Sequence, residues 1–245
     1  FDVPQNETEP RDASAAAIYG TRAANGVILI TTRKPQNNNS YIGYSGYVAI
    51  EQVAKRIEML TGDELRQYLA DNNQALGPDD NDGVNTDWQD EVMRTGVSQS
   101  HNLSLGGGNE RTVYNANINY FENEGVMKGS SLERLIAKLG IEQKTLNNHL
   151  TLGLNLSHSQ TKQELIPYQV FTSMLTYLPT VNVYNEDGSY KENWSRSASY
   201  LNPVSLIETN THHRNSSITM GSGKVKLDIT KNLVYDASLF MQQEQ

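Results

Sequence analysis

The chain has 245 residues, with 20 Lys and Arg against 28 Asp and Glu, a formal net charge of −8, and no cysteine. The acidic balance argues against a nucleic-acid partner, because neutralising phosphates requires a basic face. The absence of cysteine excludes disulfide frameworks and sites built on thiolates. No apolar run approaches the ~20 residues that a membrane helix needs, which excludes helical spanning but not a β-barrel.

The first recognisable element is DASAAAIYGTRAANGVILITT, residues 12–32. Its first residues can cap a short alanine-rich helix, and Gly20 suits a left-handed C-cap. Asn25-Gly26 is a turn signal, and the β-branched run VILITT after it is typical of a short strand buried on both sides. The stretch therefore predicts a helix–turn–strand unit, and the polar residues 33–40 predict a boundary behind it.

Seven segments with alternating apolar and polar residues follow the boundary. They are residues 41–53, 98–107, 112–123, 134–144, 150–160, 223–229 and 233–242. This period of two is typical of a sheet with one apolar and one polar face. The apolar face is expected to carry Leu135, Leu139, Leu150, Leu152, Leu154 and Leu156, and the polar face Asn115, Asn117 and Asn119.

The connections between these segments alternate in length. Those after the second, fourth and sixth segments are short, whereas residues 51–97 and 159–215 form very long connections. Within the first of these, residues 61–73 and 87–96 are helix-like. The alternation places all short turns at one end, and it predicts an antiparallel meander in chain order. Transmembrane β-barrels are built in this way, from strands of ~9–11 residues.

Motifs for catalysis or metal binding fail on inspection. The acidic stretch GPDDNDGVNTDW would place Pro78 and Gln89 at the first and twelfth positions of a calcium loop, where neither fits. The run Gly106-Gly107-Gly108 lacks the following Lys-Ser/Thr of a phosphate loop, and no G-x-S-x-G occurs. His212-His213 could touch a metal, although a solvated loop pair is the main interpretation. We therefore predict no catalytic residue, no metal site and no cofactor.

The long connection between residues 167 and 203 is rich in aromatic residues. Tyr and Trp rings present flat apolar faces with polar tips, which suits sugars and peptides. Tyr184, Tyr190 and Trp194 are the candidate ligand-binding residues. The alternative is that these aromatic side chains pack the loop against itself.

The opening stretch DASAAAIYGTRAANGVILITT closely resembles the end of the plug domain of SusC/RagA-type TonB-dependent outer-membrane transporters. The resemblance continues through YIGYSGYVAIEQVAKRIEMLTGDEL, TDWQDEVMRTG, LPTVNVYNEDGSY and NPVSLIETN. It implies that residues 1–34 are the C-terminal remnant of a plug domain. Residues 35–245 would form the N-terminal part of a transmembrane β-barrel, about seven antiparallel strands with helical segments in long outer loops. Residues 1–11 depart from the family pattern.

The resemblance also implies a function. The chain would be part of a TonB-energised importer without enzymatic activity, surrounded by lipid in the outer membrane of a Gram-negative bacterium. Its partner would be a SusD-like surface lipoprotein, and its cargo a glycan or, less often, a peptide. Because large plugged barrels have ~22 strands and the TonB-contacting segment is missing, we expect a fragment. Two alternatives stay open: a soluble or surface-attached β-sheet binding module, and a siderophore-type receptor, which NEDGSY and DWQDEV disfavour.

Overall fold

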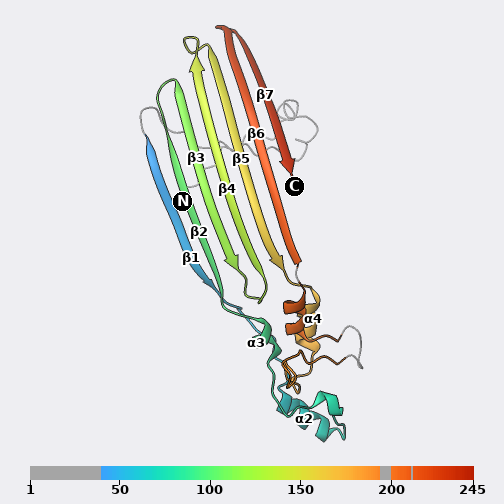
Figure 1. The fold of residues 1–245 in the computed structure, drawn as a ribbon. Coiled ribbons are helices and arrows are strands. Elements are labelled where there is room, and N and C mark those ends of the chain that lie inside the picture. The colour runs from blue at the N-terminus through green and yellow to red at the C-terminus, as the bar shows by residue number, and fades with distance from the viewer. Residues whose placement is uncertain (1–39, 194–199, 211) are drawn as a thin grey trace, which may run out of the picture. The chain divides into compact units, whose positions relative to one another are not determined.

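A computed structural model describes residues 40–193, 200–210 and 212–245, within one compact unit that spans residues 35–245. Its main feature is a seven-stranded sheet in which each strand pairs antiparallel with the next strand along the chain (Figure 1). The strands are β1 (Tyr41–Glu51), β2 (Gly96–Gly108), β3 (Thr112–Glu124), β4 (Ser131–Thr145), β5 (Leu150–Leu165), β6 (His212–Thr230) and β7 (Leu233–Glu244). The predicted meander is therefore confirmed, while the predicted helix–turn–strand unit lies outside the described residues.

Strand β6 is much longer than the alternation predicted. It begins at His212, whereas the alternating pattern predicted a start at Gly223. Residues 212–222 are mostly polar on both faces, so they carry no period of two. Their backbone groups pair instead with the second half of β5, from Leu165 opposite His212 onward. The prediction that residues up to 215 form a loop was therefore wrong at this end.

The strand register separates two chemically different faces. Ala116 lies opposite Leu139, and Leu139 lies opposite Leu156. Residues directly opposite each other point to the same side of a sheet. One register position along, the neutral polar Asn117 and Ser157 both lie opposite Lys138. The predicted apolar and polar faces are thus confirmed.

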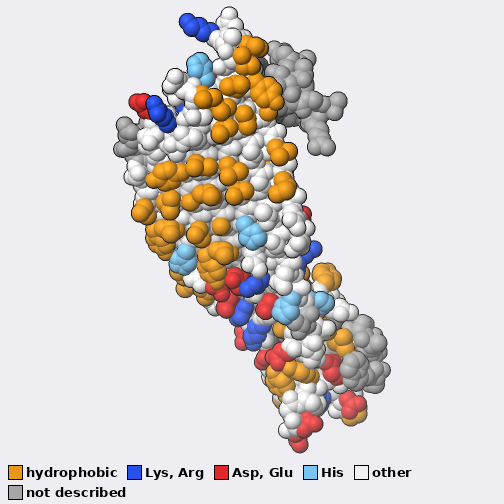
Figure 2. All heavy atoms as spheres, turned by 45° about the horizontal axis from the view of Figure 1, so that its top comes forward, with side chains coloured by type: hydrophobic (Ala, Val, Ile, Leu, Met, Phe, Trp, Pro, Cys, Tyr) orange, Lys and Arg blue, Asp and Glu red, His pale blue; other side chains and the backbone are white. Residues whose placement is uncertain are grey.

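The apolar face is open to its surroundings in the described part of the chain. Leu135, Leu139, Leu154 and Leu156 are each 42–48% exposed. Figure 2 shows hydrophobic side chains in successive rows across the sheet, with charged side chains gathered below them. Contiguous apolar surface of this extent marks contact with lipid or with another protein.

All short turns lie at one end of the sheet, as predicted. They span residues 109–111, 146–149 and 231–232, and the connections at the other end span 52–95, 125–130 and 166–211. The turn after β4 has three consecutive residues at positive φ: Leu146 at 50°, Asn147 at 55° and Asn148 at 70°. Asparagine tolerates this left-handed conformation, but a leucine there is strained.

The helices of the described residues lie in the long connections. They are α2 (Gly62–Asp71), the 3₁₀ helix η2 (Pro78–Asp80), α3 (Trp88–Val92), α4 (Gln169–Thr176) and α5 (Pro203–Thr209). Thr61 and Glu64 form a reciprocal capping box at the start of α2. Among the described residues no helix is long and apolar enough to span a membrane.

Among the described residues, the buried apolar core lies in these connections and not in the sheet. Its members are Trp88, Val92, Met127, Val170, Met174, Tyr177, Val181, Val183, Val204 and Leu206. They come from all three long-end connections. We call the described residues of these connections (52–95, 125–130, 166–193 and 200–210) the loop module, because burying one shared core makes them pack as a unit.

Candidate functional site

A short hairpin from Val183 to Lys191 follows helix α4 in the aromatic connection. Its two chains are joined by a bond from the Lys191 N–H to the Val183 carbonyl of 2.9 Å and by a bridge between Tyr184 and Tyr190. The turn needs glycine at Gly188, where φ is +81°. The local sequence therefore presents Tyr184 and Tyr190 side by side.

Asn202 anchors this hairpin to helix α5. Its side chain is fully buried, and its amide group donates to the carbonyls of Val183 at 2.7 Å and Lys191 at 3.2 Å. Its Oδ1 caps α5 by accepting from the Val204 N–H at 3.0 Å. One buried side chain thus fixes both ends of the hairpin, because every polar atom of the amide has a partner.

An aromatic cluster joins the first long connection to the last. The ring of Tyr177 meets that of Trp88 edge-on at 4.9 Å and stacks on that of Tyr200 at 4.4 Å. The indole N–H of Trp88 donates to the Leu178 carbonyl at 2.9 Å. Such contacts stabilise a core beyond the area that they bury.

An ion pair provides a second link between the two connections. Lys191 Nζ lies 2.8 Å from Asp82 Oδ1, and the Asn182 N–H donates to Asp82 Oδ2 at 3.1 Å. Burial by itself would raise the pKa of Asp82, but these two partners lower it below its ordinary value of 3.8. The charged carboxylate therefore stabilises the loop module.

Replacing Asp82 by asparagine is expected to destabilise the loop module by about 1–2 kcal/mol at pH 7. A lowered carboxyl pKa gives stability that is complete above the ordinary pKa and is lost as the pH falls through the lowered value. The wild-type module should therefore weaken below about pH 4, and Asp82→Asn should remove part of that dependence. Hydrogen exchange at pH 7 and pH 3 measures both effects. Equal pH dependence in both proteins would contradict the assignment, and Asp79→Asn, an exposed neighbour, is the control.

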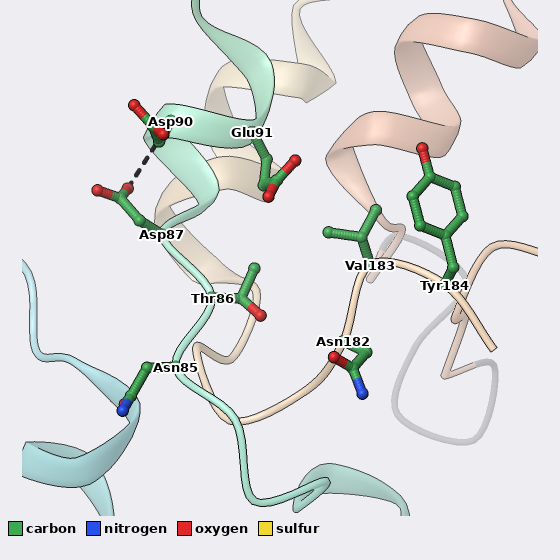
Figure 3. A pocket seen from close by; sticks show the side chains of 8 residues that line it. All are labelled: Asn85, Thr86, Asp87, Asp90, Glu91, Asn182, Val183 and Tyr184. Atoms are coloured by element: carbon green, nitrogen blue, oxygen red, sulfur yellow. Dashed lines mark hydrogen bonds between the residues drawn. The ribbon is translucent and has the colours of Figure 1, made fainter. Parts of the chain in front are cut away.

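The loop module contains a polar pocket of about 470 Å³. Eight residues from the first and last long connections line it: Asn85, Thr86, Asp87, Asp90, Glu91, Asn182, Val183 and Tyr184. Figure 3 shows Glu91 pointing from α3 into the space that separates it from the chain at residues 182–184. Amide, hydroxyl and carboxylate groups beside an exposed ring are suited to binding a hydroxyl-rich molecule.

The carboxylates of the pocket are not equivalent. Arg56 pairs with Asp87 at 3.3 Å and with Asp90 at 2.7 Å, and Asp87 also caps α3. Glu91 has no hydrogen-bond or ion-pair partner for its carboxylate among the described residues. Its backbone carbonyl accepts from Lys128 Nζ at 2.7 Å.

The structure distinguishes the two predicted ligand-binding residues that it describes, Tyr184 and Tyr190. Tyr184 lines the pocket and is 45% exposed. Tyr190 lies 5.5 Å from it, ring to ring, but packs against the core and donates its hydroxyl to Glu208 at 2.5 Å. That bond raises the pKa of Tyr190 to about 12. Trp194 lies outside the described residues.

The pKa of Tyr184 is raised, first by burial and then by the charges of Glu208 and Glu91. The ring thus lies in a negative environment. Sequence reasoning missed Asn85, Glu91 and Asn182, because these residues gather only when two connections far apart in the chain pack together. The DWQDEV segment was noted for its helical pattern and for its family resemblance, and neither reveals a pocket.

Histidine positions add no further site. His213 lies 3.8 Å from Glu164, and His158 contacts Thr219. In the part of the chain that the structure describes, no group of three or more His, Cys, Asp or Glu side chains is placed to hold a metal ion.

Comparison with known proteins gives several matches, although no family model matches the chain. It is 36% identical over 204 residues to the TonB-dependent receptor SusC of Bacteroides thetaiotaomicron, covering 79% of this chain and 20% of that protein. It is 31% identical over 216 residues to the TonB-dependent receptor P3 of Formosa agariphila, covering 83% and 21%. The chain thus spans about a fifth of the length of these curated relatives.

Solved structures share the fold. The RagAB peptide importer in its open-open state matches with a TM-score of 0.76 and 23% identity, over 96% of this chain and 31% of that chain. Its closed-closed state matches with a TM-score of 0.75 and 22% identity, over the same shares. At this level of identity the match establishes the architecture alone.

Proposed function

We propose, from the similarity of this chain to the SusC/RagA-type TonB-dependent receptors over most of its length, that it is part of an outer-membrane importer of oligosaccharides. The observation that carries the proposal is the sheet itself. It has one continuous apolar face, and its short turns are all at one end, in a chain whose relatives are TonB-dependent receptors. Lipid is the natural cover for such a face.

Within this proposal the chain divides at residue 34. Residues 1–34 are the end of a plug domain, and residues 35–245 are the first strands and outer loops of the barrel. The transporter acts without enzymatic chemistry, receives energy through TonB, and works in the outer membrane of a Gram-negative bacterium. A SusD-like surface lipoprotein is its partner. A peptide is the second candidate cargo, since the family that the chain resembles takes up glycans and, less often, peptides.

The two other interpretations have less support. A soluble or surface-attached binding module would bury its apolar sheet face under a second layer, whereas here that face is open in the described residues. A siderophore-type receptor would share the architecture, but the relatives matched include SusC itself.

We place cargo contacts in the loop module, with Tyr184 as the principal ring and Tyr190 and Trp194 as further candidates. Tyr184→Ala in the full-length transporter is expected to weaken oligosaccharide binding about two- to tenfold, the equivalent of one aromatic contact. Binding is measured by calorimetry and transport by uptake in cells.

Two controls accompany this variant. Tyr168→Ala removes a ring that is 81% exposed and absent from the pocket, and Lys231→Ala changes a turn at the opposite end of the sheet. Neither should alter binding. A loss that is equal in Tyr168→Ala and Tyr184→Ala would remove the reason for placing cargo in this pocket. Deleting the whole connection is a poor test, because it supplies Val170, Met174 and Tyr177 to the core.

A further inference from the structure

We propose that Glu91 makes the loop-module pocket selective against anionic cargo, so that neutral oligosaccharides are taken up and their carboxylated counterparts are rejected. This inference rests on the proposed importer function and adds the charge class of the cargo. It makes Glu91 a specificity-determining residue, which no feature of the sequence pattern indicated.

The charges around the pocket carry the inference. Three of the eight lining residues are acidic and none is basic. Arg56 offsets Asp87 and Asp90, and Figure 3 shows these two on the side of α3 away from the space between the chain segments. Glu91 points into that space. Two lysines lie near the pocket but do not line it. Lys128 donates to the backbone carbonyl of Glu91, and Lys191 pairs with Asp82.

The side of the pocket formed by Tyr184 is also close to negative charge. Tyr184 lies across the pocket from α3, and Glu208 accepts the hydroxyl of its neighbour Tyr190. A second carboxylate therefore lies close behind the aromatic ring. A molecule stacked on Tyr184 is exposed to negative charge from both sides, since neither Glu91 nor Glu208 forms an ion pair with a Lys or Arg in the described chain.

Recognition then depends on whether the cargo has hydrogen-bond donors to offer to Glu91. Sugar hydroxyls donate hydrogen bonds to carboxylates and accept them from an amide N–H group such as that of Asn182, which also lines the pocket. The ionised carboxylate of a uronate, like a sulfate group, has no proton to donate and places a like charge against Glu91. Specificity of this kind arises from repulsion of the wrong ligand as well as from attraction of the right one.

The test uses the full-length transporter and two matched probes. The first is a neutral oligosaccharide selected on a glycan array, and the second is the same oligosaccharide oxidised at C6 to its uronate. Calorimetry measures the affinity of each for wild type, for Glu91→Gln and for Glu58→Gln. Glu58 is exposed and absent from the pocket lining, so it controls for net charge.

In wild type the neutral probe is expected to bind more tightly than the uronate. Glu91→Gln should reduce the ratio of the two affinities about fivefold, which corresponds to the repulsion between two unit charges about 4 Å apart in water. Raising the ionic strength from about 0.05 to about 0.5 M should also reduce this affinity ratio in wild type and in Glu58→Gln, because salt screens the repulsion. The reduction should be much smaller in Glu91→Gln. A purely structural role of Glu91 would not produce this salt dependence.

Two results would overturn the inference and leave the importer function standing: equal affinity of wild type for both probes, or a gap that Glu91→Gln does not change. Failure of every oligosaccharide on the array to bind has a different meaning. It would refute the proposed glycan cargo itself, and the charge selection with it.

Discussion

Replacing Leu154 by arginine is expected to make folding of the full-length transporter into a bilayer less favourable by about 2–4 kcal/mol, the cost of a charge on the lipid face of a barrel near the midplane. Leu154 lies opposite Ile141 and Gly223 on the apolar face and is 44% exposed. Urea titration of refolding into dilauroyl phosphatidylcholine vesicles measures the change.

The next residue provides the matched control. Asn155 points to the other face, opposite Gly140 and Ser222, and Asn155→Arg should change stability by about 0.5 kcal/mol or less. If the two arginine variants cost the same, the apolar face does not meet lipid. The proposal of a transmembrane sheet would then lose its main support.

Trp88→Ala is expected to open the loop module by removing about 3–5 kcal/mol of its stability. The indole is 3% exposed, it packs on Tyr177, and its loss also leaves the Leu178 carbonyl without its donor. Hydrogen exchange of the full-length transporter should show faster exchange in α3, α4 and α5.

The sheet should respond differently, because the buried core lies in the connections and not between the strands. Exchange in β3 and β4 is expected to stay slow in Trp88→Ala. Tyr168→Ala, which removes an exposed ring elsewhere in the loop module, should leave both regions unchanged. Faster exchange throughout the sheet would contradict the description of the loop module as a separate packed unit.

The sheet was predictable because its pattern is local. In β3, four apolar residues alternate with Asn115, Asn117 and Asn119, and this period of two specifies both the strand and its faces. Connection lengths then specified the antiparallel order. The first half of β6 could not be found in this way, since HHRNSSITMGS is polar on both sides and forms a strand only because β5 offers it a partner.

The candidate site was less predictable, because it depends on contacts between residues about 90 to 100 positions apart. Tyr184 and Tyr190 are equivalent in the sequence, two tyrosines flanking a turn. Packing makes them different: Tyr190 is held by Glu208 against the core, and Tyr184 is left at the pocket. Glu91 lines a pocket only because residues 182–184 pack near α3. The periodicity of neither segment predicts that contact.

The unshifted register of β1 to β6 has a consequence for how such a chain can diversify. A residue inserted within a strand would exchange the inward and outward positions of everything beyond it in that strand. The same insertion in residues 52–95 or 166–211 leaves every strand position on its own side, and lengthening a loop carries little entropic penalty. Insertions and deletions are therefore tolerated best in the long connections, at the end of the sheet that holds the pocket. Related chains can thus differ in the ligands that they recognise while the strands of the sheet keep their pairing.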